Sequence, residues 1–281
     1  MLDLAGASGS GRALLLLAIA LLIGGLVTGF LSGLLGIGGG GIVAPILYEV
    51  FGIIGVDPAV RMHCAVGTAL AVMIPTSIRS FMAHKARGGV DMEAWRRLGV
   101  GVVAGVVIGA LVASVSPGTL LKWVWVGFAT VMSLKLVFGK EQWRLGEQLP
   151  NAPLTELYGA FVGVISTLLS IGGGAFINTF MTLYGRTIQT AVGTASGIGP
   201  LIAIPGTIGF LWAGLGVAGR PELSLGYVNL VGFVLVGATS VLAAPWGVRL
   251  AHGVSRRALE LAFAAMLSTI GLRFLWTLLF E

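Results

Sequence analysis

Long apolar runs alternate with short polar breaks along almost the whole chain. We interpret each run as a helical segment, because a helix needs about 20 mostly apolar residues to cross the hydrocarbon core of a bilayer. The second, sixth and seventh runs are short or interrupted by glycine, so we expect some of them to be half-helices. The ten runs cover residues 13–35, 38–55, 63–83, 98–115, 121–138, 156–171, 174–186, 189–213, 226–247 and 258–279.

Composition supports a membrane protein. Of the 281 residues, 56 % are hydrophobic and only 10 % are charged, whereas soluble domains carry about 25 % charged residues. This excludes a water-soluble enzyme and a disordered protein. The single cysteine, Cys64, excludes an intrachain disulfide, and no motif indicates a metal or a cofactor. We therefore expect neither.

The net charge of +6 does not indicate a nucleic-acid partner. The basic residues lie in the short breaks between apolar runs, where they orient a membrane protein by the positive-inside rule. The first run, 13–35, is too long for the core of a signal peptide and lacks a cleavage site, so we expect a retained first helix.

Two halves of the chain resemble each other, which indicates an internal repeat. The segment 35–41 (LGIGGGG) corresponds to 169–175 (LSIGGGA), and 65–69 (AVGTA) recurs at 191–195. The stretch from Phe128 to Ser133 corresponds to that from Phe263 to Ser268. We expect a first membrane repeat at 1–138, a cytoplasmic linker at 139–155 and a second membrane repeat at 156–281.

Charge counting indicates that the repeats are inverted. If each repeat crosses the bilayer five times, loops 84–97, 139–155, 186–188 and 248–257 share one side. Twelve of the 17 basic residues then lie at or near that side, which the positive-inside rule makes cytoplasmic. The predicted fold class is an all-α polytopic membrane protein with two inverted-topology repeats of about five segments and glycine-rich broken helices near the midplane.

The glycines fall into two groups. Glycines spaced four apart at 25–33, 101–109 and 159–163 are typical of closely packed membrane helices. The block Gly38 to Gly41 and its counterpart Gly172 to Gly174 have no such period, and each glycine costs about 1 kcal/mol inside a helix. We expect helix breaks there, facing protein or a watery cavity. A half-helix that begins after such a break presents free N–H groups and its positive end to an anion.

Candidate substrate-binding residues lie in these glycine runs and on nearby helices. Membrane threonines more often bond to their own helix, and Asn178 could equally serve an interhelical hydrogen bond. The candidates are Gly38, Gly39, Gly40, Gly41, Thr68 and Thr76 in the first half, and Gly172, Gly173, Gly174, Asn178, Thr179, Thr194 and Ser196 in the second.

A few ionisable residues are candidates for gating or coupling. Glu49 lies inside the second run and could carry protons, and Arg273 lies inside the last run; either could face a water-filled path. Arg79 could attract anions or, with Lys135, snorkel to the interface. His84 could couple export to protons or simply cap a loop. Trp123, Trp125, Trp212 and Trp276 are expected in an interfacial belt.

These motifs resemble the TauE/SafE sulfite exporter family over about residues 20–278. The resemblance rests on 29–45, Gly67 to Ala69, Pro75 to His84, 88–91, 171–175 and 193–195. It implies a multi-pass protein of the bacterial inner membrane that exports sulfite or organosulfonates such as sulfoacetate or sulfolactate. Ser170, where the first copy has glycine, is a departure.

The function predicted is a secondary transporter that exports small sulfur-containing anions by alternating access, which inverted duplication favours over an open pore. The alternatives are an anion channel or a carrier of another small carboxylate or oxyanion. An intramembrane hydrolase using Ser196 is disfavoured, because the three histidines lie at segment ends. The partners expected are a small anion and the lipid bilayer, with no nucleic acid; a homodimer stays open.

Overall fold

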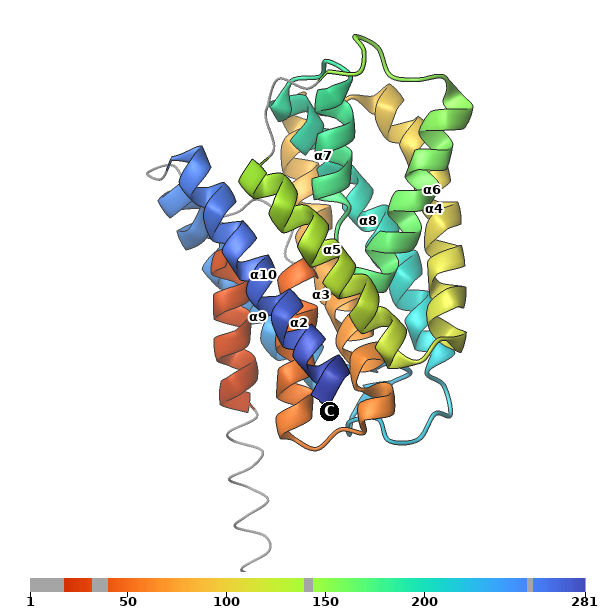
Figure 1. Cartoon of the computed structure of the whole chain (residues 1–281), viewed down its shortest axis with the longest axis vertical. Helices are drawn as coiled ribbons and strands as arrows, with labels where there is room; N and C mark the ends of the chain where they lie inside the picture. The colour runs from red at the N-terminus through yellow and green to blue at the C-terminus, as the bar shows by residue number, and fades with distance from the viewer. Residues whose placement is uncertain (1–17, 32–39, 139–143, 252–254, 281) are drawn as a thin grey trace, which may run out of the picture.

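The chain folds into a bundle of helices (Figure 1). The computed structural model describes residues 18–31, 40–138, 144–251 and 255–280. Each predicted apolar run overlaps one helix, and several helices extend beyond their runs. The helices are the first helix, Ala18–Leu31, then α2 Gly40–Ile53, α3 Pro58–Ala86, α4 Met92–Val115, α5 Gly118–Phe138, α6 Ala152–Leu169, α7 Gly174–Leu183, α8 Ile188–Ala213, α9 Leu230–Ala251 and α10 Arg256–Phe280.

Seven of these helices are long and apolar enough to cross a membrane, namely α3, α4, α5, α6, α8, α9 and α10. Helices α2 and α7 are shorter, with 14 and 10 residues. The expectation of half-helices among the second, sixth and seventh runs therefore fits α2 and α7, whereas α6 is long enough to cross.

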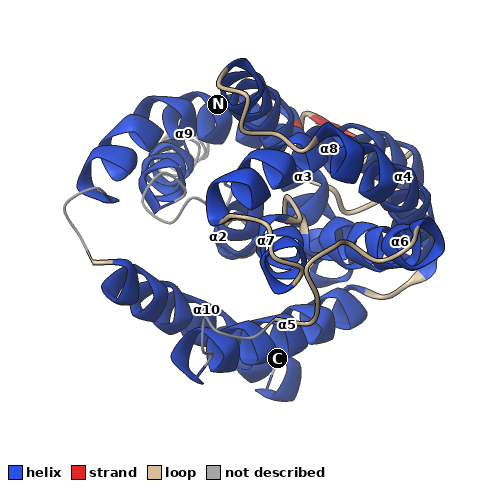
Figure 2. Ribbon diagram, turned by 90° about the horizontal axis from the view of Figure 1, so that it is seen from above, coloured by secondary structure: helices blue, strands red, loops and turns tan. Residues whose placement is uncertain are grey.

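Seen from one end, α2 and α7 lie at the centre of the bundle (Figure 2). Around them, α3 packs against α8, α4 against α6, and α5 against α10. The α5–α10 pair forms one wall, and α3, α4, α6 and α8 form the wall on the other side (Figure 2).

The predicted small-residue faces are helix contacts. A Cβ atom on Gly105 of α4 would lie 2.0 Å from the carbonyl oxygen of Ala160 in α6, and one on Gly163 would lie 2.3 Å from that of Val102. Likewise, a Cβ atom on Gly29 would lie 2.2 Å from the carbonyl oxygen of Ser240 in α9. These backbones approach closely because glycine leaves no side chain between them. Gly33 lies outside the described residues.

The connecting loops gather at two ends of the bundle. At one end, Arg186 forms an ion pair with Asp91 at 3.2 Å, and the Leu145 N–H donates to the Leu183 carbonyl. At the other end, Gly219 lies against Asp57. The loops 84–97, 139–155 and 186–188, predicted to share one side, thus meet through their described residues.

Two sequence expectations are wrong. Trp125, expected in an interfacial belt, is 0 % exposed, whereas Trp123, Trp212 and Trp276 lie on the outer surface. The ninth run was expected to be apolar helix from residue 226. Its first four residues instead form the turn and second strand of a hairpin of β1 Ser224–Leu225 with β2 Val228–Asn229. Helix α9 begins only at Leu230, where the Asn229 side chain accepts the Gly232 N–H.

Candidate functional site

The site is built around a break between α6 and α7. Helix α6 ends at Leu169 and is followed by Ser170, whose φ of 52° is left-handed; α7 begins after Gly173, whose φ is 70°. Residues 170–173 are all buried. A Cβ atom on Gly173 would lie 3.0 Å from Ile202 Cδ1. The positive φ angle and the close packing together therefore favour glycine at position 173.

Free backbone amides line this break. The first N–H of α7 with a backbone acceptor is that of Ile177, which donates to the Gly173 carbonyl at 2.9 Å. Within the described residues, the N–H groups of 172–176 have no acceptor. Buried amides are normally paired, and the start of a helix carries a partial positive charge. The break can therefore bind a negatively charged group.

The start of α2 contacts this break. A Cβ atom on Gly41 would lie 3.1 Å from Ile171 Cγ1 and 4.0 Å from Trp125 Cη2. From this contact α2 and α7 run toward opposite ends of the bundle (Figure 1). The glycine-rich segments of the two halves thus meet. Gly38 and Gly39 lie outside the described residues, while Gly40 and Gly41 form the first turn of α2.

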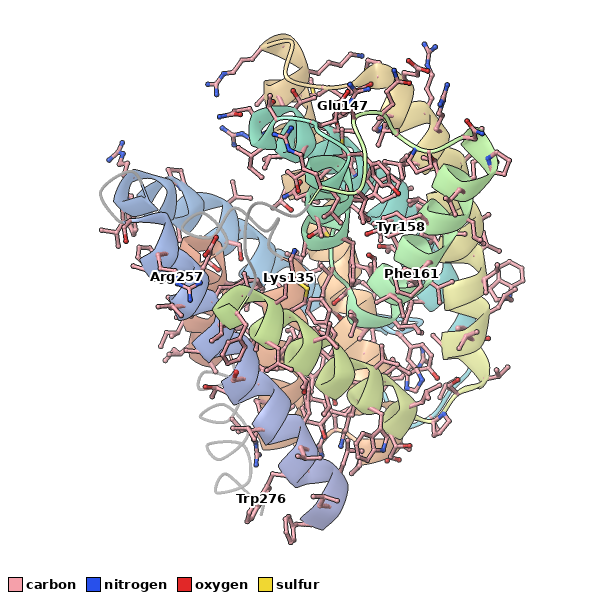
Figure 3. The ribbon with its side chains drawn as sticks, turned by 45° about the horizontal axis from the view of Figure 1, so that its top comes forward. Lys135, Glu147, Tyr158, Phe161, Arg257 and Trp276 are labelled. Carbon is pink, nitrogen blue, oxygen red and sulfur yellow. The ribbon has the colours of Figure 1, made fainter. Side chains whose placement is uncertain are left out.

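Helix α5 contacts both short helices. Its Phe128 ring lies 5.7 Å from the Phe176 ring of α7, and Lys135 donates a hydrogen bond to the Thr179 hydroxyl of α7. Figure 3 labels Lys135 in the last turn of α5. The sequence indicated only a lysine that snorkels to the interface, because nothing local to α5 indicates contact with α7.

Three buried polar atoms on the elements that surround the break have no hydrogen-bond partner among the described residues. They are Trp125 Nε1 on α5, Ser166 Oγ near the end of α6 and Asn178 Oδ1 on α7. Such groups are rare in folded proteins, and an absent ligand or water is one explanation. Asn178 was a sequence candidate, whereas Trp125 and Ser166 were missed.

Thr68 and Thr194 hold loops at opposite ends of the bundle. The Thr68 hydroxyl accepts the Asn229 N–H at 2.9 Å, and the Thr194 hydroxyl accepts the Asp91 N–H at 2.9 Å. Beside each threonine, a Cβ atom on Gly67 or Gly193 would collide with a backbone carbonyl, at 2.8 and 1.9 Å respectively. These hydroxyls therefore have partners within the protein.

Thr76 and Ser196 bond to their own helices. Thr76 donates to the Met73 carbonyl at 3.0 Å, and Ser196 donates to the Gly193 carbonyl at 2.6 Å. Thr179 likewise donates to the Ala175 carbonyl at 2.7 Å. Backbone bonding of this kind was the alternative that the sequence offered for membrane hydroxyls.

The candidates for gating lie apart from the break. Glu49 of α2 pairs with Arg273 of α10, with Nε–Oε1 at 2.9 Å and Nη2–Oε2 at 3.2 Å. Arg79 is exposed on α3. His84 lies in the last turn of α3, where its carbonyl accepts the N–H groups of Arg87 and Gly89.

Comparisons with known proteins agree on a transporter. The family model described as sulfite exporter TauE/SafE matches residues 21–274. A "Probable membrane transporter protein" of Haemophilus influenzae is 30 % identical over 258 residues, covering 90 % of this chain and 96 % of the relative. One of the same description from Methanocaldococcus jannaschii is 28 % identical, covering 92 % and 95 % respectively. No solved structure matches the chain significantly.

Proposed function

Because the chain belongs to the TauE/SafE family of membrane transporters, we propose that it exports small sulfur-containing anions by alternating access. The substrates would be sulfite or organosulfonates such as sulfoacetate, and the membrane would be a bacterial inner membrane. As family and relatives are transporters, the multi-pass chain is not an enzyme.

The observation that carries the proposal is the row of free N–H groups at 172–176. These amides lie at the start of α7, where the positive end of the helix favours an anion. Irregular backbone is tolerated at membrane depth only when it is buried in protein or lines a cavity. A sulfonate or sulfite group offers several oxygen acceptors to such amides.

Matched contacts support two inverted repeats. Thr68 of α3 holds the first residue before α9, and Thr194 of α8 holds the first residue before α4. Helices that correspond by sequence, α3 with α8 and α5 with α10, pack against each other. Each half thus makes the same contact with the other half, as a two-fold relation between the halves would produce. Inverted repeats with broken helices are typical of carriers that expose one site alternately to the two sides.

Substrate counterflow in proteoliposomes tests the proposal. Purified full-length protein loaded with sulfoacetate should take up labelled sulfoacetate with saturable kinetics, and sulfite should compete. Asn178→Ala should weaken this uptake, whereas Thr269→Ala, which alters an exposed hydroxyl of α10, should not. An ohmic anion current without counterflow would indicate a channel. Absence of both, with sulfite and sulfoacetate alike, would overturn the proposal.

A further inference from the structure

We propose that the indole N–H of Trp125 donates a hydrogen bond to the transported anion. The inference rests on the proposed function and adds a binding residue from α5 to the amides of α7. Trp125 is 0 % exposed, and its Nε1 has no acceptor within the described residues.

An unsatisfied donor in this place needs an explanation. A buried polar group without a partner loses its hydrogen bonds to water and gains nothing in return. A purely packing role would be served by phenylalanine, which has no such group to bury. The cost is recovered when an anion occupies the site and accepts the bond.

The ring of Trp125 lies beside the segment where α2 begins. Trp125 Cη2 lies 4.0 Å from the Cβ position of Gly41, which itself contacts Ile171. Cη2 belongs to the six-membered ring and is joined to Nε1 through Cε2 and Cζ2, so the contact places the far end of the indole ring beside the start of α2. The ring is held by Phe128 and Phe274, each with its centroid 5.9 Å away and in an edge-on arrangement.

The chemistry of indole suits an anion. The indole N–H donates and cannot accept a hydrogen bond, so it discriminates against cations and against groups that only donate. It carries no charge, and therefore would not trap an anion that must be released. With the α7 amides, it would contact the oxygens of a sulfite or sulfonate group from a second helix.

Anion binding to the purified full-length protein tests this inference with one substitution and a matched control. Trp125→Phe removes the N–H and keeps an aromatic ring, whereas Trp123→Phe changes a neighbouring tryptophan that is 50 % exposed. We expect Trp125→Phe to weaken sulfoacetate affinity at least tenfold, in thermal-shift titrations and in the KM for counterflow. Trp123→Phe should retain wild-type affinity. Wild-type affinity in Trp125→Phe would overturn the inference.

A second measurement does not depend on the variant folding. In wild-type protein with ¹⁵N-labelled indoles, titration with sulfoacetate should move one of the seven indole N–H resonances, assigned to Trp125 by single Trp→Phe substitutions at the other positions. If the protein binds sulfoacetate and no resonance assigned to Trp125 moves, the inference fails while the proposed function stands. If the wild-type protein binds neither sulfite nor sulfoacetate, both fail.

Discussion

The hydroxyl of Thr194 accepts a 2.9 Å hydrogen bond from the backbone N–H of Asp91, 103 positions earlier in the chain. Asp91 also caps α4, because its side chain accepts the Ala94 N–H at 3.0 Å. One threonine in the second half thus fixes the start of a helix in the first half. Thr68 and Asn229 make the reciprocal contact at the other end.

Removal of either hydroxyl should loosen one end of the bundle. Thr194→Val or Thr68→Val leaves the partner N–H without its acceptor, so each should lower the free energy of unfolding by about 1–2 kcal/mol. The measurement is the apparent melting temperature in detergent. Thr130→Val is the control, since Thr130 is exposed and its hydroxyl donates to the Val126 carbonyl of its own helix. A melting temperature for Thr194→Val equal to that of the control would contradict this role.

Close contact between α4 and α6 predicts a large difference between two glycines. Gly105→Leu places atoms where the Ala160 carbonyl lies, 2.0 Å from the new Cβ, whereas a Cβ on Gly127 meets nothing within 4 Å. Gly105→Leu should abolish recovery of monodisperse protein in size-exclusion chromatography. Gly127→Leu should leave recovery near the wild-type value. Folded Gly105→Leu protein would show that these helices can separate.

The helix break depends on Gly173. Gly173→Ala must hold a φ of 70° with a Cβ atom, and strain of this kind costs about 1–3 kcal/mol. The variant should melt earlier and show weaker sulfoacetate counterflow, because the amides of α7 shift. Gly237 in helix α9 is the control, because a Cβ atom there would lie 4.0 Å from its nearest neighbour, Val72 Cγ2. Gly237→Ala should melt at the wild-type temperature or above it. A higher melting temperature for Gly173→Ala than for Gly237→Ala would contradict this prediction.

The Glu49–Arg273 pair predicts recovery by charge exchange. A charged side chain inside a membrane helix is costly and usually pairs with an opposite charge. Glu49→Gln, which removes the carboxylate partner of Arg273, should therefore reduce counterflow and folded yield. The double variant Glu49→Arg with Arg273→Glu should recover more of both than either single reversal. If Glu49→Gln reduces counterflow and the double variant recovers neither counterflow nor folded yield, Glu49 has a role beyond pairing with Arg273.

Cysteine labelling tests the orientation derived from charge. Cys64, the one native cysteine, is buried and leaves a low background. A cysteine at Glu147, labelled in Figure 3 on the linker, should react with an impermeant maleimide only in opened cells. A cysteine at Gly216, in the loop before β1, should react in intact cells. If the cysteine at position 147 reacts in intact cells and that at position 216 reacts only in opened cells, the orientation is opposite to the one predicted.

Sequence could predict the helices and the faces on which some of them pack closely. The ten apolar runs match the ten described helices to within a few residues. Among the starts of α2 to α10, the largest differences are at α3, α4, α6 and α9, which begin five, six, four and four residues from the expected starts. Hydropathy defines such runs because lipid tolerates few charges within a span. The period of four among glycines at 101–109 and 159–163 likewise predicted a close-packing face on each helix, since those residues share one helix face. The structure shows that the two faces pack against each other.

Contacts between distant segments were beyond prediction. Glu49 and Arg273 are separated by 224 positions, and neither carries a local signal that identifies its partner. Trp125 was assigned to the interface because tryptophans usually lie there, while its burial follows from packing against Phe274 and Phe128. Thr68 and Thr194 stay predicted substrate ligands, but a single sequence does not reveal that each hydroxyl also accepts a backbone N–H from a distant loop.

The short lengths of α2 and α7 have an electrical consequence. At 1.5 Å per residue they extend about 21 and 15 Å, less than the hydrocarbon thickness of about 30 Å. If water reaches the outer end of each, the membrane voltage falls over the thin barrier around Gly41 and Ile171. An inside-negative voltage then contributes about 2.3 kcal/mol per charge for each 100 mV toward expelling an anion. Electrical force alone could then drive efflux, with no co-transported ion.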